Sequence, residues 1–175
     1  MRDTNKRLRG FLAALLLGLA ATALAPAMAA ESILRDFDGN PRQLEDYVGQ
    51  GKWTVVMFWA YDCHICNLEA PRYEKLYQRR GERDLTVLGI SIDGEEQKKE
   101  AQAFIREHKL SFPNLIGEPE ATTLMFTDLT GARWIGTPTF LIYTPTGKLV
   151  AQQAGGVPVS MIEDFIAQQT AAGNL

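Results

Sequence analysis

The chain has 175 residues, with 18 Lys or Arg, 21 Asp or Glu, a formal net charge of −3 and 46% apolar residues. This composition excludes a disordered chain, which would be less apolar and more highly charged. The acidic balance argues against a nucleic-acid-binding or anionic-membrane surface. Cys63 and Cys66 are the only cysteines, and with two histidines they cannot build a disulfide scaffold or a cysteine-rich zinc module.

The first 29 residues have the pattern of a secretory signal. Four basic residues precede Gly10, a Leu-rich apolar run follows, and Ala27-Met28-Ala29 closes it. The alternative is an uncleaved membrane anchor, because the uncharged stretch is about long enough to cross a bilayer. We expect residues 1–29 to be a signal peptide and 30–175 to form one domain, periplasmic or anchored at the inner membrane facing the periplasm. That domain carries 14 basic and 20 acidic residues, a net charge of −6.

The first half of the domain alternates between strands and helices. Continuous β-branched and aromatic runs indicate strands buried on both faces. We predict a strand over 31–37, one helical turn over 43–48, a buried strand over 53–59, a helix over 63–80, a buried strand over 85–92 and a helix over 95–108. On the helix over 63–80 we expect Leu68, Tyr73, Leu76 and Tyr77 to face inward.

The second half predicts a short helix over 121–126, then an antiparallel pair of strands over 139–143 and 148–153 joined by a Pro-Thr-Gly turn. Ser160 and Glu163 predict a capping box that opens a last helix. This order predicts an α/β fold with a mixed central sheet flanked by helices, parallel at first and antiparallel at one edge.

The cysteine pair lies where the strand over 53–59 passes into a helix. Cys63 would sit at the helix N-terminus, where free N–H groups and the dipole favour its thiolate. Cys66, one turn deeper, would be less exposed and could resolve a mixed disulfide formed by Cys63. A purely structural disulfide would close a very small loop and stabilise little, and a metal site would need more ligands. The pattern favours redox catalysis.

At this point the chain resembles the thioredoxin superfamily, and within it the exported TlpA/ResA/CcmG (DsbE) group of thiol-disulfide oxidoreductases. The resemblance rests on motifs spread over most of residues 31–170: 58–60, the Cys63–Cys66 pair, 69–71, 87–93, 136–142, Gly147 and 155–156. It implies a thioredoxin-like fold, with the segment between Asp93 and Phe126 as the helix-and-strand insertion of the TlpA-like group.

The resemblance also implies roles for individual residues. Pro138 matches the family's cis-proline, which faces the cysteine pair, and the backbone of Thr137 would pair with a client. Glu69 matches an acidic residue thought to serve reductases of this group, whereas Met57 stands where thioredoxin has a buried Asp. A carboxylate at Glu69 would raise the thiol pKa values by repulsion and could transfer the proton of the exchange. The alternative is a solvated helix glutamate.

Other residues make the direction of electron flow less certain from sequence. Asp62 replaces the family's usual Trp before Cys63, and its charge should disfavour the thiolate. His64 could tune the potential by its charge or a hydrogen bond, or be only an exposed loop residue. We expect His108 only to complement a helix dipole and Trp134 to have a packing role.

The sequence therefore predicts a monomeric thiol-disulfide oxidoreductase that needs no metal and no cofactor. Its partners would be client protein thiols and disulfides, of cytochrome c maturation type or similar, and a membrane thiol electron donor. The rival in direction is a disulfide-forming oxidant. A peroxiredoxin-like peroxidase is a further alternative, but Ala60 stands where its Thr-x-x-Cys loop needs Thr. A Sco-like copper module is another, but it needs a wider cysteine spacing.

Overall fold

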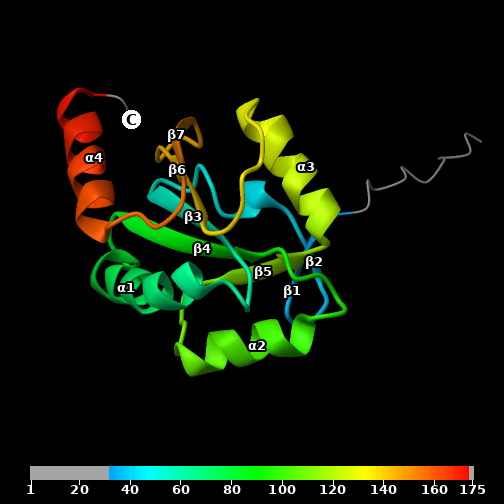
Figure 1. The fold of residues 1–175 in the computed structure, drawn as a ribbon. Helices are drawn as coiled ribbons and strands as arrows, with labels where there is room; N and C mark the ends of the chain where they lie inside the picture. The colour runs from blue at the N-terminus through cyan, green and yellow to red at the C-terminus, as the bar shows by residue number, and fades with distance from the viewer. Residues whose placement is uncertain (1–31, 174–175) are drawn as a thin grey trace, which may run out of the picture. The chain divides into compact units, whose positions relative to one another are not determined.

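The computed structural model describes residues 32–173, so the predicted signal peptide over 1–29 lies outside the described residues. Figure 1 shows the order of the elements. They are β1 (Leu34–Asp36), β2 (Pro41–Arg42), the 3-10 turn η1 (Leu44–Asp46), β3 (Trp53–Trp59), α1 (His64–Arg80), β4 (Leu85–Ser91), α2 (Lys98–Glu107), β5 (Asn114–Gly117), α3 (Pro119–Thr130), β6 (Thr139–Tyr143), β7 (Leu149–Ala154) and α4 (Val159–Ala171).

The strands form one mixed sheet in the order β2-β1-β5-β4-β3-β6-β7. Its centre is parallel, because β4 pairs with β3 on one side and β5 on the other in the same direction. The predicted antiparallel edge of β6 and β7 is confirmed. The expectation of a single such edge is wrong, because the hairpin of β1 and β2 adds a second antiparallel edge beside β5.

Strand β3 lies inside the sheet between β4 and β6, and all seven of its residues are buried. Successive side chains of a strand point to opposite faces. Val55, Met57 and Trp59 join the core beneath α1, α2 and α4, while Val56 and Phe58 join the core beneath η1 and α3. Because both faces are covered, the run of apolar residues in β3 alternates between two separate cores (Figure 1).

Helix α1 follows the prediction closely in its bounds but not in every inward residue. Tyr73 and Leu76 are fully buried and Tyr77 is half-buried against the same core. Leu68 was expected to face inward, but half of its side chain is exposed. It lies five positions before Tyr73, which places it away from the stripe of Cys66, Ala70 and Tyr73 that faces the sheet.

The capping box predicted for the last helix is wrong. Helix α4 begins at Val159, its N-cap is Pro158, and no side chain caps it. The Pro158 carbonyl accepts the backbone N–H of Met161, which starts the helix before Ser160 is reached. Ser160 therefore lies inside the first turn, where it cannot act as the N-cap.

The segment between β4 and α3 contains the helix and strand that the resemblance implied. They are α2 and β5, although α2 begins at Lys98, three residues later than predicted. Helix α3 is longer than the predicted 121–126. Between residues 32 and 173, no helix is both long enough and apolar enough to span a membrane.

Candidate active site

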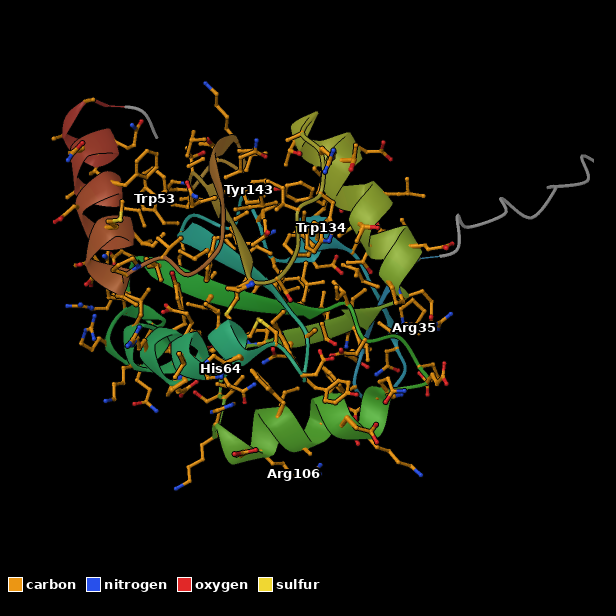
Figure 2. All side chains as sticks on the ribbon, viewed as in Figure 1. Arg35, Trp53, His64, Arg106, Trp134 and Tyr143 are labelled. Carbon is orange, nitrogen blue, oxygen red and sulfur yellow. A yellow bond between two sulfur atoms is a disulfide. The ribbon has the colours of Figure 1, made fainter. Side chains whose placement is uncertain are left out.

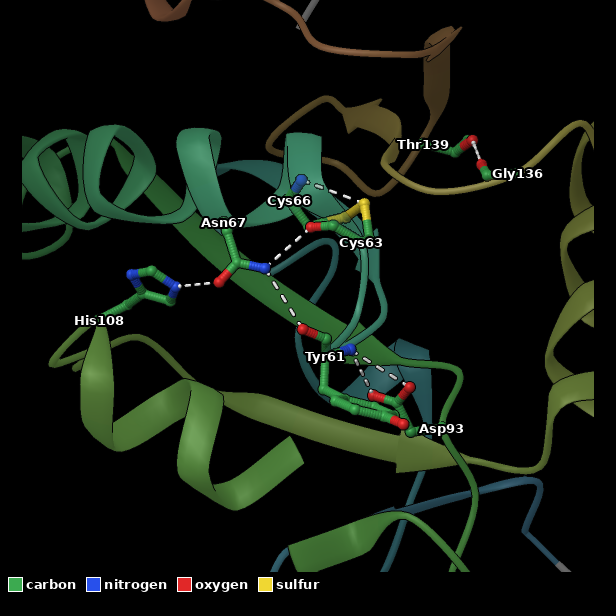
Figure 3. The surroundings of a disulfide bond; sticks show 8 residues. All are labelled: Tyr61, Cys63, Cys66, Asn67, Asp93, His108, Gly136 and Thr139. Carbon is green, nitrogen blue, oxygen red and sulfur yellow. Dashed lines mark hydrogen bonds between the residues drawn. A yellow bond between two sulfur atoms is a disulfide. The ribbon is translucent and has the colours of Figure 1, made fainter. Parts of the chain in front are cut away.

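Cys63 and Cys66 form a disulfide at the first turn of α1, with their Cα atoms 5.2 Å apart. Cys63 is the N-cap residue of the helix, and its Sγ accepts the backbone N–H of Cys66 at 3.1 Å (Figure 3). Cys66 is fully buried, whereas Cys63 is half-buried. The predicted asymmetry between an accessible outer sulfur and a buried inner one is therefore present.

The loop between β3 and α1 is held from below by Asp93. Both carboxylate oxygens of Asp93 accept the backbone N–H of Tyr61, at 3.1 and 3.3 Å, and one also accepts the hydroxyl of Ser91 at 2.6 Å. Burial raises the pKa of Asp93, and the nearby negative charge of Asp62 acts in the same direction, while the hydrogen bonds from Ser91 and Tyr61 oppose it. The half-buried carboxylate of Asp93 thus anchors the loop through the Tyr61 backbone.

Asn67 contacts the same loop from its other side, and His108 contacts Asn67; the sequence analysis did not predict either contact. The Asn67 side-chain amide donates to the carbonyls of Cys63 at 2.9 Å and Tyr61 at 3.3 Å. His108, the C-cap residue of α2, places its Nε2 2.9 Å from the Asn67 Oδ1 (Figure 3). His108 does more than complement a dipole, and no sequence signal joins two residues so far apart in the chain.

Glu69 is buried. The alternative interpretation of Glu69 as a solvated helix glutamate is therefore wrong. Its Oε1 accepts a hydrogen bond from the Arg72 Nη1 at 2.7 Å, while its Oε2 is buried without a hydrogen-bond partner. Burial and then repulsion from Glu69 raise the pKa of Tyr73, whose hydroxyl donates to the Val157 carbonyl. Glu69 therefore presents one unsatisfied carboxylate oxygen one helical turn from Cys66.

The Thr137–Pro138 peptide bond is cis, as the resemblance implied. The Pro138 carbonyl accepts the backbone N–H of Gly155 at 2.8 Å, and the Thr139 hydroxyl donates to the Gly136 carbonyl at 2.6 Å (Figure 3). In the part of the chain that the structure describes, no residue forms a hydrogen bond with the Thr137 backbone. These groups are free to pair with an incoming chain.

Around the pair, the surface mixes charge and apolar side chains. Asp62 and His64 are exposed on either side of Cys63. Ile65 and Ile135 are also exposed, the latter by 80%. Trp134, in contrast, lies beside α3 (Figure 2) and packs edge-on against Phe58 and Phe126, as expected for a packing residue.

Met57 is buried in β3 at the position where the resemblance to thioredoxin would place an acid. Two carboxyl groups of α1 are buried, those of Glu69 and Glu74, and Glu69 is the one within one helical turn of Cys66. Across residues 32–173, His, Cys, Asp and Glu side chains form no group of three that could hold a metal ion.

The model of the AhpC/TSA family matches residues 23–152. The thiol-disulfide oxidoreductase ResA of Bacillus cereus is 24% identical over 139 residues, 79% of this chain and 74% of that protein. Alkyl hydroperoxide reductase C of Mycobacterium tuberculosis is 44% identical, but over 46 residues, 26% of this chain and 24% of that protein. Among solved structures, the thioredoxin domain of a thiol-disulfide oxidoreductase from Bacteroides vulgatus has a TM-score of 0.61 at 25% identity, covering 79% of this chain and 99% of that one.

The similarity to the thioredoxin domain of the Bacteroides vulgatus protein agrees with the mixed sheet described above. The chain therefore belongs to the AhpC/TSA family, has a thioredoxin-like fold, and carries the Cys-x-x-Cys pair of a thiol-disulfide oxidoreductase.

Proposed function

We propose that this chain is an exported, periplasmic reductase that transfers the electrons of its Cys63–Cys66 dithiol to disulfides of client proteins. The observation that carries the proposal is the pair itself, an N-cap cysteine backed by a fully buried partner. Similarity to ResA over most of the chain supports the same chemistry. A membrane thiol donor would return the electrons, and the predicted signal over residues 1–29 supports export.

In the reaction, the Cys63 thiolate attacks one sulfur of the client disulfide, and the other client sulfur leaves as a thiolate. Cys66 then loses its proton and attacks the Cys63 Sγ. This step breaks the mixed disulfide, releases the second client thiolate and leaves Cys63 and Cys66 oxidised. Two electrons move to the client, and the client thiolates take up two protons.

The helix N-terminus supports the first step. The backbone N–H of Cys66 already donates to the Cys63 Sγ at 3.1 Å, and the same donor would stabilise the thiolate in the reduced protein. Glu69 would accept the proton of Cys66 in the second step, since its Oε2 is buried and unpartnered. Thr137, with its backbone groups free beside Pro138, would hold an extended client segment next to the disulfide.

A peroxidase is the second candidate, because the short similarity to alkyl hydroperoxide reductase C reaches 44%. It is weaker, because Ala60 stands where the peroxidatic loop needs Thr, and the similarity covers about a quarter of the chain. Rapid consumption of hydrogen peroxide by the reduced protein, at a rate that exceeds reduction of a protein disulfide, would favour the peroxidase.

Trapping a client tests the proposal. Cys66→Ala should accumulate a mixed disulfide between Cys63 and a periplasmic protein, because the resolving thiol is missing. Cys63→Ser should trap none, and it is the matched control. Absence of any Cys63-dependent adduct in cells, together with no reduction of a model protein disulfide by the purified dithiol, would overturn the function.

A further inference from the structure

The inserted segment holds the redox loop at two points on either side of Tyr61. Asp93, at the start of the segment after β4, accepts the Tyr61 N–H. At the other end of α2, His108 contacts Asn67, and the Asn67 amide donates to the Tyr61 carbonyl and the Cys63 carbonyl. The peptide groups just before Cys63 are therefore bound on both sides by groups tied to the insertion (Figure 3).

Hydrogen-bonding chemistry fixes how Asn67 and His108 must be oriented. The two loop groups that Asn67 meets are carbonyl oxygens, which only accept, so the Asn67 NH2 group faces the loop and its Oδ1 faces α2. The Oδ1 in turn only accepts, so the His108 Nε2 must carry a hydrogen and donate. The Phe104 ring packs edge-on against the imidazole, with centroids 4.5 Å apart, and limits its rotation.

We propose that Asn67 and His108 are positioning residues of the Cys63–Cys66 couple, in which His108 orients the Asn67 amide and the amide holds Cys63 at the N-cap of α1. This proposal rests on the proposed redox function of that pair. His108 acts through Asn67, and neither side chain touches the reacting sulfurs.

The two redox states depend on these bonds to different degrees. In the oxidised protein, the disulfide itself ties Cys63 to the helix, so the hydrogen bonds to its carbonyl are partly redundant. In the reduced protein that covalent tie is gone, and the hydrogen bonds keep the Cys63 sulfur near the N–H groups that stabilise a thiolate. Loss of the bonds should therefore destabilise the reduced form more than the oxidised form.

The test is the equilibrium of the purified protein with glutathione. At a fixed glutathione ratio, Asn67→Ala should raise the ratio of oxidised to reduced protein about tenfold, because it loses the hydrogen bonds to the Cys63 and Tyr61 carbonyls. A tenfold change corresponds to about 30 mV for a two-electron couple. His108→Ala should raise it about threefold in the wild-type background, and should add almost nothing in the Asn67→Ala background. His108→Gln, which retains a donor, should restore most of the wild-type ratio.

Glu107→Ala removes the neighbouring exposed side chain of α2 and should leave the ratio unchanged. If Asn67→Ala does not fold, Asn67→Leu, of similar size but uncharged and without the donor, supplies the measurement. A structural role alone would lower the melting temperatures of both redox forms equally and leave the ratio at the wild-type value, which would overturn the proposal. An equal effect of His108→Ala with and without Asn67 would also overturn it. The glutathione equilibrium needs no client, so it can succeed even if the wild-type protein reduces no protein disulfide.

Discussion

Glu69 and Glu74 lie five residues apart on α1, and both are buried, but their oxygens are treated differently. Glu74 is fully satisfied: its Oε1 accepts from the Ser111 hydroxyl at 2.6 Å and from Gln78 at 2.8 Å, and its Oε2 accepts the Ser111 backbone N–H at 2.7 Å. Glu69 has an exposed arginine on one oxygen and no partner on the other.

The difference separates a structural acid from a candidate functional one. A buried carboxylate is costly unless hydrogen bonds satisfy it. Glu74 meets that condition and ties α1 to the connection between α2 and β5. Glu69 does not, and it is the one beside the redox pair. Under the proposed function, we therefore expect Glu74 to contribute to the stability of this part of the fold and Glu69 to transfer the proton of Cys66.

Glu69→Gln gives the largest expected effect. The amide fills the same space but cannot carry the proton of Cys66, so reduction of a model protein disulfide should slow about a hundredfold near neutral pH. The rate should also lose one ionisation from its pH profile, measured from acidic to alkaline pH. A profile with the wild-type shape and rate would remove Glu69 from the mechanism.

Glu74→Gln should act on stability instead. The amide replaces one acceptor oxygen of Glu74 with an NH2 group, so Ser111 or Gln78 loses its hydrogen-bond acceptor. The free energy of unfolding should fall by about 2 kcal/mol. Urea unfolding of the oxidised protein measures this loss. The rate of disulfide reduction, followed over the same pH series as for Glu69→Gln, should stay within about twofold of wild type. If Glu74→Gln altered the pH profile, the comparison between the two acids would fail.

Arg72→Gln tests the single partner of Glu69. The Arg72 side chain is 60% exposed, and an exposed ion pair is worth under about 1 kcal/mol. Without the guanidinium, the Glu69 Oε1 loses its hydrogen-bond donor, so the rate of disulfide reduction should change by less than about fivefold. High salt should change the wild-type rate in the same direction and leave the rate of the variant unchanged. A change as large as that of Glu69→Gln would contradict the minor role given to the pair.

Asp93 extends the comparison to a third acid and gives the smallest effect. Burial raises its pKa above the ordinary value of 3.8, so its protonated form is favoured by folding. Its contribution to stability is therefore complete at acidic pH and is lost as pH rises from about 4 through its pKa in the folded protein. Asp93→Asn, which still offers an oxygen to the Tyr61 N–H, should lack this decline in urea unfolding followed over the same range. If the free energy of unfolding fell more steeply with pH in Asp93→Asn than in wild type, the predicted sign of the Asp93 contribution would be wrong.

Local patterns made much of this molecule predictable. The apolar run of β3, the position of Cys63 at the start of α1 and the turn between β6 and β7 each depend on neighbouring residues, and each is present. The burial of Glu69, in contrast, depends on the packing of α1 against the loop that contains Gly156, whose Cα faces the Glu69 carboxylate. Hydrophobic pattern alone would place a glutamate on the surface.

Long-range contacts account for what sequence reasoning missed. The bond between Asn67 and His108 joins two helices that are separated by β4, and neither residue belongs to a motif. The second antiparallel edge requires β1 to find β5 about eighty residues later in the chain. The capping box was predicted from local spacing alone, and that prediction is wrong. Ser160 and Glu163 have the required spacing, but the N-cap of α4 is Pro158.

The reduction potential of the wild-type Cys63–Cys66 couple tests the central claim most directly. The account predicts a reducing couple, clearly below about −200 mV and nearer to thioredoxin at about −270 mV, because the proposed role is to pass electrons to client disulfides. A potential close to that of the strongly oxidising periplasmic disulfide donors, about −120 mV, would contradict it and make the protein a disulfide-forming oxidant.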